Sequence, residues 1–152
     1  MELKGIRNKN SLIGLEKPEI TGLSGGNMLE VVGQERVDSL RKAIQEIKHL
    51  IEERKKLSLE FIREAEEIKS EINNLILGNE STLRALGQNE ALIEKNALRN
   101  KKVEISELQL NEKIDCWKDI ALLKKELRIY EKELSEKEGR MKELNDILSE
   151  GE

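Results

Sequence analysis

The sequence is poor in aromatic residues and has a single cysteine. Trp, Tyr and Phe occur once each among 152 residues, so aromatics make up 2% of the chain. Globular cores usually draw much of their buried area from aromatic side chains, so this composition argues against a compact globule. The lone cysteine, Cys116, excludes a disulfide within the chain. It favours an intracellular, reducing compartment such as the cytoplasm or the nucleus.

Long apolar runs and blocks of like charge are also missing. No run approaches the roughly 18 consecutive apolar residues of a transmembrane helix, and the first residues lack the apolar stretch of a signal peptide. The net charge is only −4 and the pI is near 5.4, which disfavours general binding to nucleic-acid phosphates. We therefore expect no membrane span and no nucleic-acid partner.

What the sequence does contain is charge and a regular apolar period. Charged residues are 38% of the chain. Between residues 37 and 77, apolar residues recur in alternating steps of four and three, which is the heptad pattern of a coiled coil. Such a stripe must pack against another helix. The predicted a positions are Val37, Ile44, Ile51, Ala65 and Ile72, and the predicted d positions are Leu40, Ile47, Phe61, Ile68 and Leu75.

A second periodic stretch follows after residue 100. Three consecutive steps of three, from Ile114 to Leu123, indicate a local overwinding of the supercoil. We predict that Trp117 fills the core at this irregularity; the other hypothesis is a contact with a partner, because Trp is common in binding hot spots. The predicted seam of this stretch is Val103, Leu110, Ile114, Trp117, Ile120, Leu123, Leu127, Tyr130, Leu134, Met141, Leu144 and Leu148.

The segment between the two stretches places several asparagines at core positions and contains two glycines, so it predicts a break and a reversal of the chain. If the chain folds back near residues 89–90, Arg41 approaches Glu138 and Leu40 approaches Met141. The predicted fold is therefore all-α, a long antiparallel helical hairpin or coiled coil with a flexible N-terminal arm. The alternative is a parallel coiled-coil dimer with a joint near residues 78–100.

The N-terminal arm differs in kind from the rest of the chain. It holds five of the ten glycines and the only proline, which is typical of a flexible segment. Apolar islands within it suggest a second interpretation, a linear segment that orders on a partner through Leu12, Ile13, Leu15 and Ile20. The predicted organisation is an arm over 1–26, a first helix over 27–77, the break over 78–100, a second helix over 101–149 and a tail over 150–152.

The first helix carries more apolar residues than a two-stranded seam requires. Ala43, Leu50 and Leu57 fall at g and widen its apolar stripe. We predict that these three residues, together with Trp117 and the apolar islands of the arm, contact protein partners. The partners would be other coiled-coil subunits or a second copy of the chain.

No pattern in the sequence indicates catalysis or a cofactor. The only histidine, His49, falls at an outer helix position, and Cys116 has no second cysteine or histidine near it. We expect no metal, no cofactor and no small-molecule substrate. The sequence favours a non-enzymatic structural or adaptor protein, a subunit of a larger assembly that docks partner helices. The alternative is a holdase-like or secretion-type chaperone that grips clients with the hairpin tip or the arm.

Overall fold

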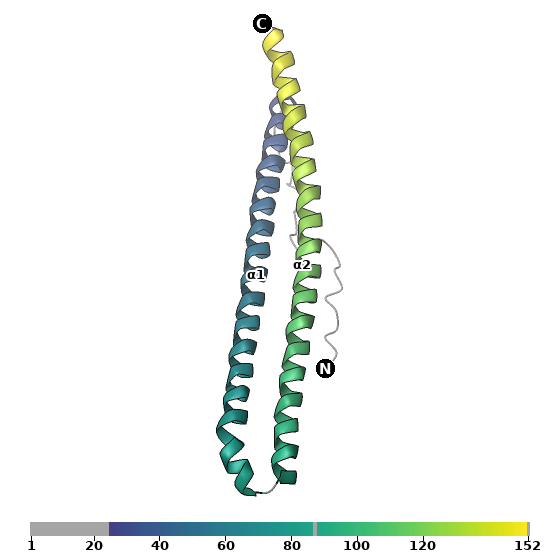
Figure 1. Ribbon diagram of the computed structural model, residues 1–152. Helices are drawn as coiled ribbons and strands as arrows, with labels where there is room; N and C mark the ends of the chain where they lie inside the picture. Colours follow the sequence, from purple (N-terminus) through teal and green to yellow (C-terminus); the bar gives the residue numbers. More distant parts are fainter. Residues whose placement is uncertain (1–24, 87, 152) are drawn as a thin grey trace. The chain divides into compact units, whose positions relative to one another are not determined.

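The computed structural model describes residues 25–86 and 88–151, which form two α-helices. Helix α1 spans Gly25–Leu86 and helix α2 spans Gln88–Glu150. They run antiparallel and pack against each other (Figure 1), so the predicted all-α helical hairpin is confirmed. Leu12, Ile13, Leu15 and Ile20 lie outside the described residues, and so does most of the predicted arm.

The helices extend further than the sequence predicted. Helix α1 continues through Gly78 to Leu86, and α2 begins at Gln88, so most of residues 78–100 is helical. Polar residues at core positions weaken the packing between two helices, but each lowers the stability of the helix itself by less than about 1 kcal/mol. The apolar pattern can therefore end where the helix continues.

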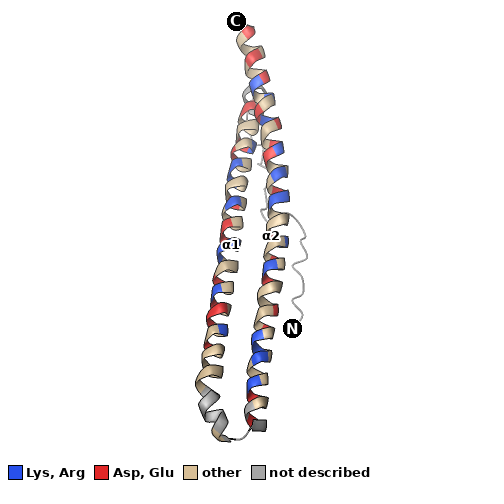
Figure 2. Cartoon of the chain, in the orientation of Figure 1, with Lys and Arg blue, Asp and Glu red and all other residues tan. Residues whose placement is uncertain are grey.

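The described chain divides into two compact units. The terminal unit combines α1 up to His49 with α2 from Leu123 onward, and the tip unit is Leu50–Leu122. Acidic and basic side chains are interspersed along both helices in each unit (Figure 2). We describe the two units separately below.

In the terminal unit, α1 buries its a, d and g positions. The buried residues are Val37, Leu40, Ala43, Ile44 and Ile47 on α1 and Tyr130 on α2. Two ion pairs flank them, Arg36 with Glu133 and the predicted Arg41 with Glu138, each with 2.7 Å between nitrogen and oxygen.

The predicted seam of α2 is only partly correct in the terminal unit. Leu127, Leu134 and Met141 are half-buried, as the heptad pattern predicts. Leu144 and Leu148 are exposed. Because Gly33 lies opposite Met141, these two leucines lie level with the first turns of α1.

In the tip unit, α1 turns a different flank toward α2. The a positions remain buried at Ile51, Ser58, Ala65 and Ile72. The residues that accompany them are the half-buried e positions Ile62, Lys69 and Ile76. The predicted d residues Phe61, Ile68 and Leu75 are exposed, so their assignment to the seam was wrong.

Helix α2 also differs from prediction in the tip unit. Gln109 and Cys116 are buried there, and Lys102, Ile105 and Glu112 are half-buried. The residues expected in the seam are exposed instead: Val103, Leu110, Ile114 and Trp117. Ile120 is half-buried, as predicted. The α2 side of this seam therefore mixes polar residues with the apolar Ile105, Cys116 and Ile120.

In the terminal unit the predicted Arg41–Glu138 pair forms, but the apolar residues that face each other differ from the prediction by one heptad. A side chain on Gly33 would lie 3.9 Å from the sulfur of Met141, whereas the prediction placed Met141 opposite Leu40. Helix α1 ends at Leu86 and α2 begins at Gln88, so the chain reverses earlier than predicted. A shift of seven residues leaves every heptad position unchanged, so the pattern alone could not distinguish the two registers.

Candidate helix-docking surfaces

A cluster of charged side chains holds the seam of the tip unit around Arg54. Its Nε donates to Asp119 Oδ2 at 2.8 Å, and its second guanidinium nitrogen donates to Glu112 Oε1 at 2.5 Å. These hydrogen bonds raise the pKa of Arg54, and the one to Glu112 has the larger effect. One α1 side chain thus binds two α2 side chains that lie two turns apart.

Gln109 forms the second polar contact of this seam. The side chain is buried, and its Nε2 donates to the Ile62 carbonyl at 3.1 Å and to Glu66 Oε1 at 2.9 Å. Glu66 also pairs with Lys69 at 2.7 Å. Hydrogen bonds from Lys69 and, to a smaller extent, from Gln109 lower the pKa of Glu66.

These polar contacts fix which face of α2 meets α1. Lys102 adds a third, because its Nζ lies 2.6 Å from Asn73 Oδ1. Arg54, Gln109 and Lys102 make directional hydrogen bonds that a rotated α2 would lose. With this face of α2 toward α1, Val103, Leu110, Ile114 and Trp117 are exposed.

The first exposed surface, which we call the α1 stripe, consists of Leu57, Phe61, Ile68 and Leu75. All four are exposed, Leu57 by 59%. Phe61, Ile68 and Leu75 each follow a buried a residue by three positions, which places them about 60° around the helix from the buried line. The α1 stripe is therefore a row of exposed apolar residues beside the seam, in which Phe61, Ile68 and Leu75 recur every two turns.

Glutamates border the α1 stripe. They are Glu60, Glu64, Glu67 and Glu71. Glu67 lies 3.9 Å from Arg63. Within the described part of the chain, Glu60, Glu64 and Glu71 form no ion pair. The edge of the stripe therefore carries net acidic charge.

The second exposed surface, the α2 stripe, consists of Val103, Leu110, Ile114 and Trp117. Val103 and Leu110 are 57% exposed, and Trp117 is 72% exposed. Val103, Leu110 and Trp117 each follow a seam residue by one position, so they lie about 100° around α2 from the seam. Lys113 and Lys118 border the end of this stripe that contains Ile114 and Trp117.

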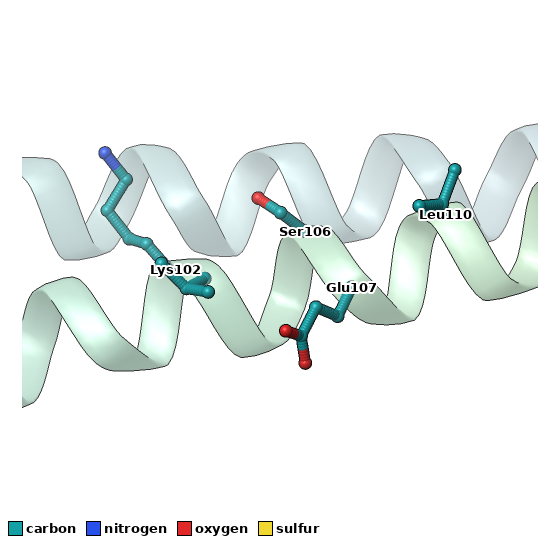
Figure 3. A pocket seen from close by; sticks show the side chains of 5 residues that line it. Lys102, Ser106, Glu107 and Leu110 are labelled. Carbon is teal, nitrogen blue, oxygen red and sulfur yellow. The ribbon is translucent and has the colours of Figure 1, made fainter.

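A surface depression opens along the α2 stripe. Its lining includes Val103, Ser106, Glu107 and Leu110, which follow one another at i, i+3, i+4 and i+7. Four residues at this spacing form the hole that receives one side chain of a facing helix in a coiled coil. Figure 3 shows these side chains along successive turns of α2, with Lys102 reaching toward α1 and Glu107 directed away from it.

A depression with the same spacing on α1 has a different character. Leu59 is its one apolar lining residue, and the others are charged: Glu52, Lys55, Lys56, Glu60 and Arg63. Such a surface is typical of a solvated outer helix face. We therefore restrict the candidate docking surfaces to the α1 and α2 stripes.

The residues predicted to contact partners differ in their exposure to solvent. Leu50 and Leu57 are exposed, as a docking role requires. Ala43 is 1% exposed and lies in the core of the terminal unit, so its assignment to a docking surface does not fit the folded hairpin. Trp117 is not a core residue, and the prediction that it fills the seam was wrong.

Sequence reasoning missed most of both stripes because it assigned their residues to the hairpin seam. These residues are Phe61, Ile68, Leu75, Val103, Leu110 and Ile114. The available signal was the total width of the apolar pattern. Helix α1 has apolar residues at a, d, e and g, and one partner helix covers only part of so wide a face.

Over residues 25–86 and 88–151, no group of three His, Cys, Asp or Glu side chains is placed to hold a metal ion. His49 is exposed, and Cys116 is a buried free thiol. In the same ranges, neither helix is both long enough and apolar enough to cross a membrane. Comparison with protein-family models, curated proteins and solved structures finds no match.

Proposed function

We propose that this chain is a non-enzymatic structural or adaptor protein, a helical hairpin that docks partner helices within a larger assembly. The observation that supports the proposal is the exposure of two apolar lines at heptad spacing, the α1 and α2 stripes. Helix-in-groove recognition uses anchors at this spacing.

The composition of the stripes supports docking over simple solvent exposure. Single exposed apolar residues are ordinary, but contiguous apolar patches mark interaction sites. Trp117, Phe61 and the neighbouring leucines are also residue types that bury much area in an interface. A hairpin that leaves such residues exposed presents a preformed surface to another helix.

The test is capture of partners from the native source by the full chain, with a matched pair of variants. Phe61→Glu with Ile68→Glu places charge in the α1 stripe, whereas Leu59→Glu places the same charge on an exposed leucine outside both stripes. We expect the stripe variant to lose at least tenfold of the captured partner in quantitative mass spectrometry. Leu59→Glu should retain it.

Equal capture by the stripe variant and the wild-type chain, with helicity unchanged, would contradict the proposal. The same variants also address the alternative, a holdase-like chaperone. The exposed Leu92 and Ile93 near the start of α2 are the observation that favours it. Suppression of the aggregation of an unfolded client, equally by wild type and stripe variant, would support that alternative.

A further inference from the structure

We propose that the helix docked on each stripe belongs to a second copy of this chain, with the α1 stripe of one copy packed on the α2 stripe of another. This inference rests on the proposed function, because it names the partner of the docking surfaces. It concerns the tip unit alone, where both stripes lie.

The two stripes match in spacing. Phe61, Ile68 and Leu75 recur every seven residues on α1, and Val103, Leu110 and Trp117 recur every seven residues on α2. Two helices with equal heptad spacing can bring all three layers into contact at once. The depression bordered by Val103 and Leu110 offers a hole for one large side chain of the facing stripe.

Charge disfavours the pairing of two α1 stripes. Glu64 and Glu71 lie in line with the stripe, and Glu60 borders it without an ion pair. A symmetric α1–α1 contact would bring these glutamates against their own copies, and like charges destabilise such pairs. The α1 stripe therefore fits a helix with basic edges.

The α2 stripe supplies such edges. Lys113 and Lys118 border Ile114 and Trp117, and Arg99 lies one turn before Val103. The nearby acid Glu104 is already paired with Lys101, at 3.0 Å. Glu107 also lines the depression within this stripe, so the α2 stripe carries the bases Arg99, Lys113 and Lys118 against one acid that is unpaired in the described ranges. Its net charge is therefore opposite to that of the α1 stripe.

Contacts between the α1 stripe of one copy and the α2 stripe of another can be made in two ways. If both stripes of each copy are used at once, two copies close into a symmetric dimer. If each copy uses one stripe per contact, the contacts continue into a larger ring or an open chain of subunits. The mass of the wild-type protein in solution should therefore rise with concentration beyond the 17.5 kDa of one chain.

The experiment uses two variants of the full chain that each lack one stripe. The first, Phe61→Glu with Ile68→Glu, keeps the α2 stripe, and the second, Leu110→Glu with Trp117→Glu, keeps the α1 stripe. Both variants carry the same charge, so their altered surfaces repel each other in the mixture. Their controls are Leu59→Glu and Leu108→Glu, which charge exposed leucines outside the stripes. Light scattering after size exclusion gives the mass of each protein and of the mixtures.

We expect each stripe variant alone to remain at the mass of one chain. An equimolar mixture of the two should reach twice that mass and stop there, since one intact stripe on each partner meets the other. Both control variants should assemble like the wild type. No other pairing of these surfaces gives two inert variants that combine with each other.

A wild-type mass of one chain at all concentrations, or a mixture that stays at one chain, would overturn the proposal. Self-association by the second variant alone would indicate α1–α1 pairing instead and would equally overturn it. These results leave the proposed function intact, because that proposal fails only when the stripe variant captures the same partner as the wild type.

Discussion

At the scale of single residues, Arg54 links the two helices of the tip unit. It occupies a d position that the heptad pattern reserves for an apolar side chain, and it is half-buried. Its guanidinium reaches carboxylates on two turns of α2, Glu112 and Asp119. Hydrogen bonds to charged groups contribute more than neutral ones, so a polar core position can stabilise the pairing when both partners are present.

Replacement of this side chain should therefore be costly. We expect Arg54→Ala to lower the free energy of unfolding by about 1–3 kcal/mol, because two charge-assisted hydrogen bonds are lost and two acids remain close together. Urea unfolding followed by circular dichroism measures the change.

The control for that substitution is Arg63→Ala. Arg63 is exposed and has only a loose contact, 3.9 Å, with Glu67. An exposed pair of this kind contributes at most about 1 kcal/mol. Equal destabilisation by the two substitutions would mean that the Arg54 hydrogen bonds add nothing to the hairpin.

At the scale of the helices, the sequence predicted the a positions and the chain reversal, but not the register or the second flank. The buried line Val37, Ile44, Ile51, Ala65 and Ile72 has a seven-residue period that is visible in the sequence alone. Whether d or e residues accompany that line depends on where α2 lies. The polar contacts of Arg54 and Gln109 contribute to that placement, and a hydrophobic pattern does not encode them.

The register itself can be measured with spin labels. In the structure Asn73 contacts Lys102, the neighbour of residue 101, whereas the register predicted from the sequence places residue 73 level with residue 108. Positions 101 and 108 are about 10 Å apart along α2. We expect labels at 73 and 101 to give a shorter distance than labels at 73 and 108, in protein diluted with unlabelled chain.

The contact between Lys102 Nζ and Asn73 Oδ1 is the basis of this expectation. The reverse order of the two distances would favour the register shifted by one heptad. Equal distances would point to a chain that samples both registers.

At the scale of the whole molecule, pairing of the two helices within one chain means that the chain can fold without a second copy. The hairpin confirms that α1 has its partner helix in the same polypeptide. The rival parallel dimer would fold only as two chains join. Stability that depends on assembly rises with protein concentration, whereas the stability of a self-contained hairpin does not.

A variant with both stripes charged makes this difference measurable. We expect the chain carrying Phe61→Glu, Ile68→Glu, Leu110→Glu and Trp117→Glu to remain highly helical, because all four side chains are exposed. Its melting temperature should be the same over a wide range of protein concentration. A melting temperature that increases with concentration would contradict folding as a single chain.

The exposure of Trp117 has a practical consequence. It is the only tryptophan of the chain, and most of its indole surface meets water. Indole emission depends on the polarity around the ring, so the wild-type protein carries a natural optical reporter at one end of the α2 stripe. A helix that docks on the α2 stripe and buries Trp117 should shift the emission toward the blue, so no added dye is needed.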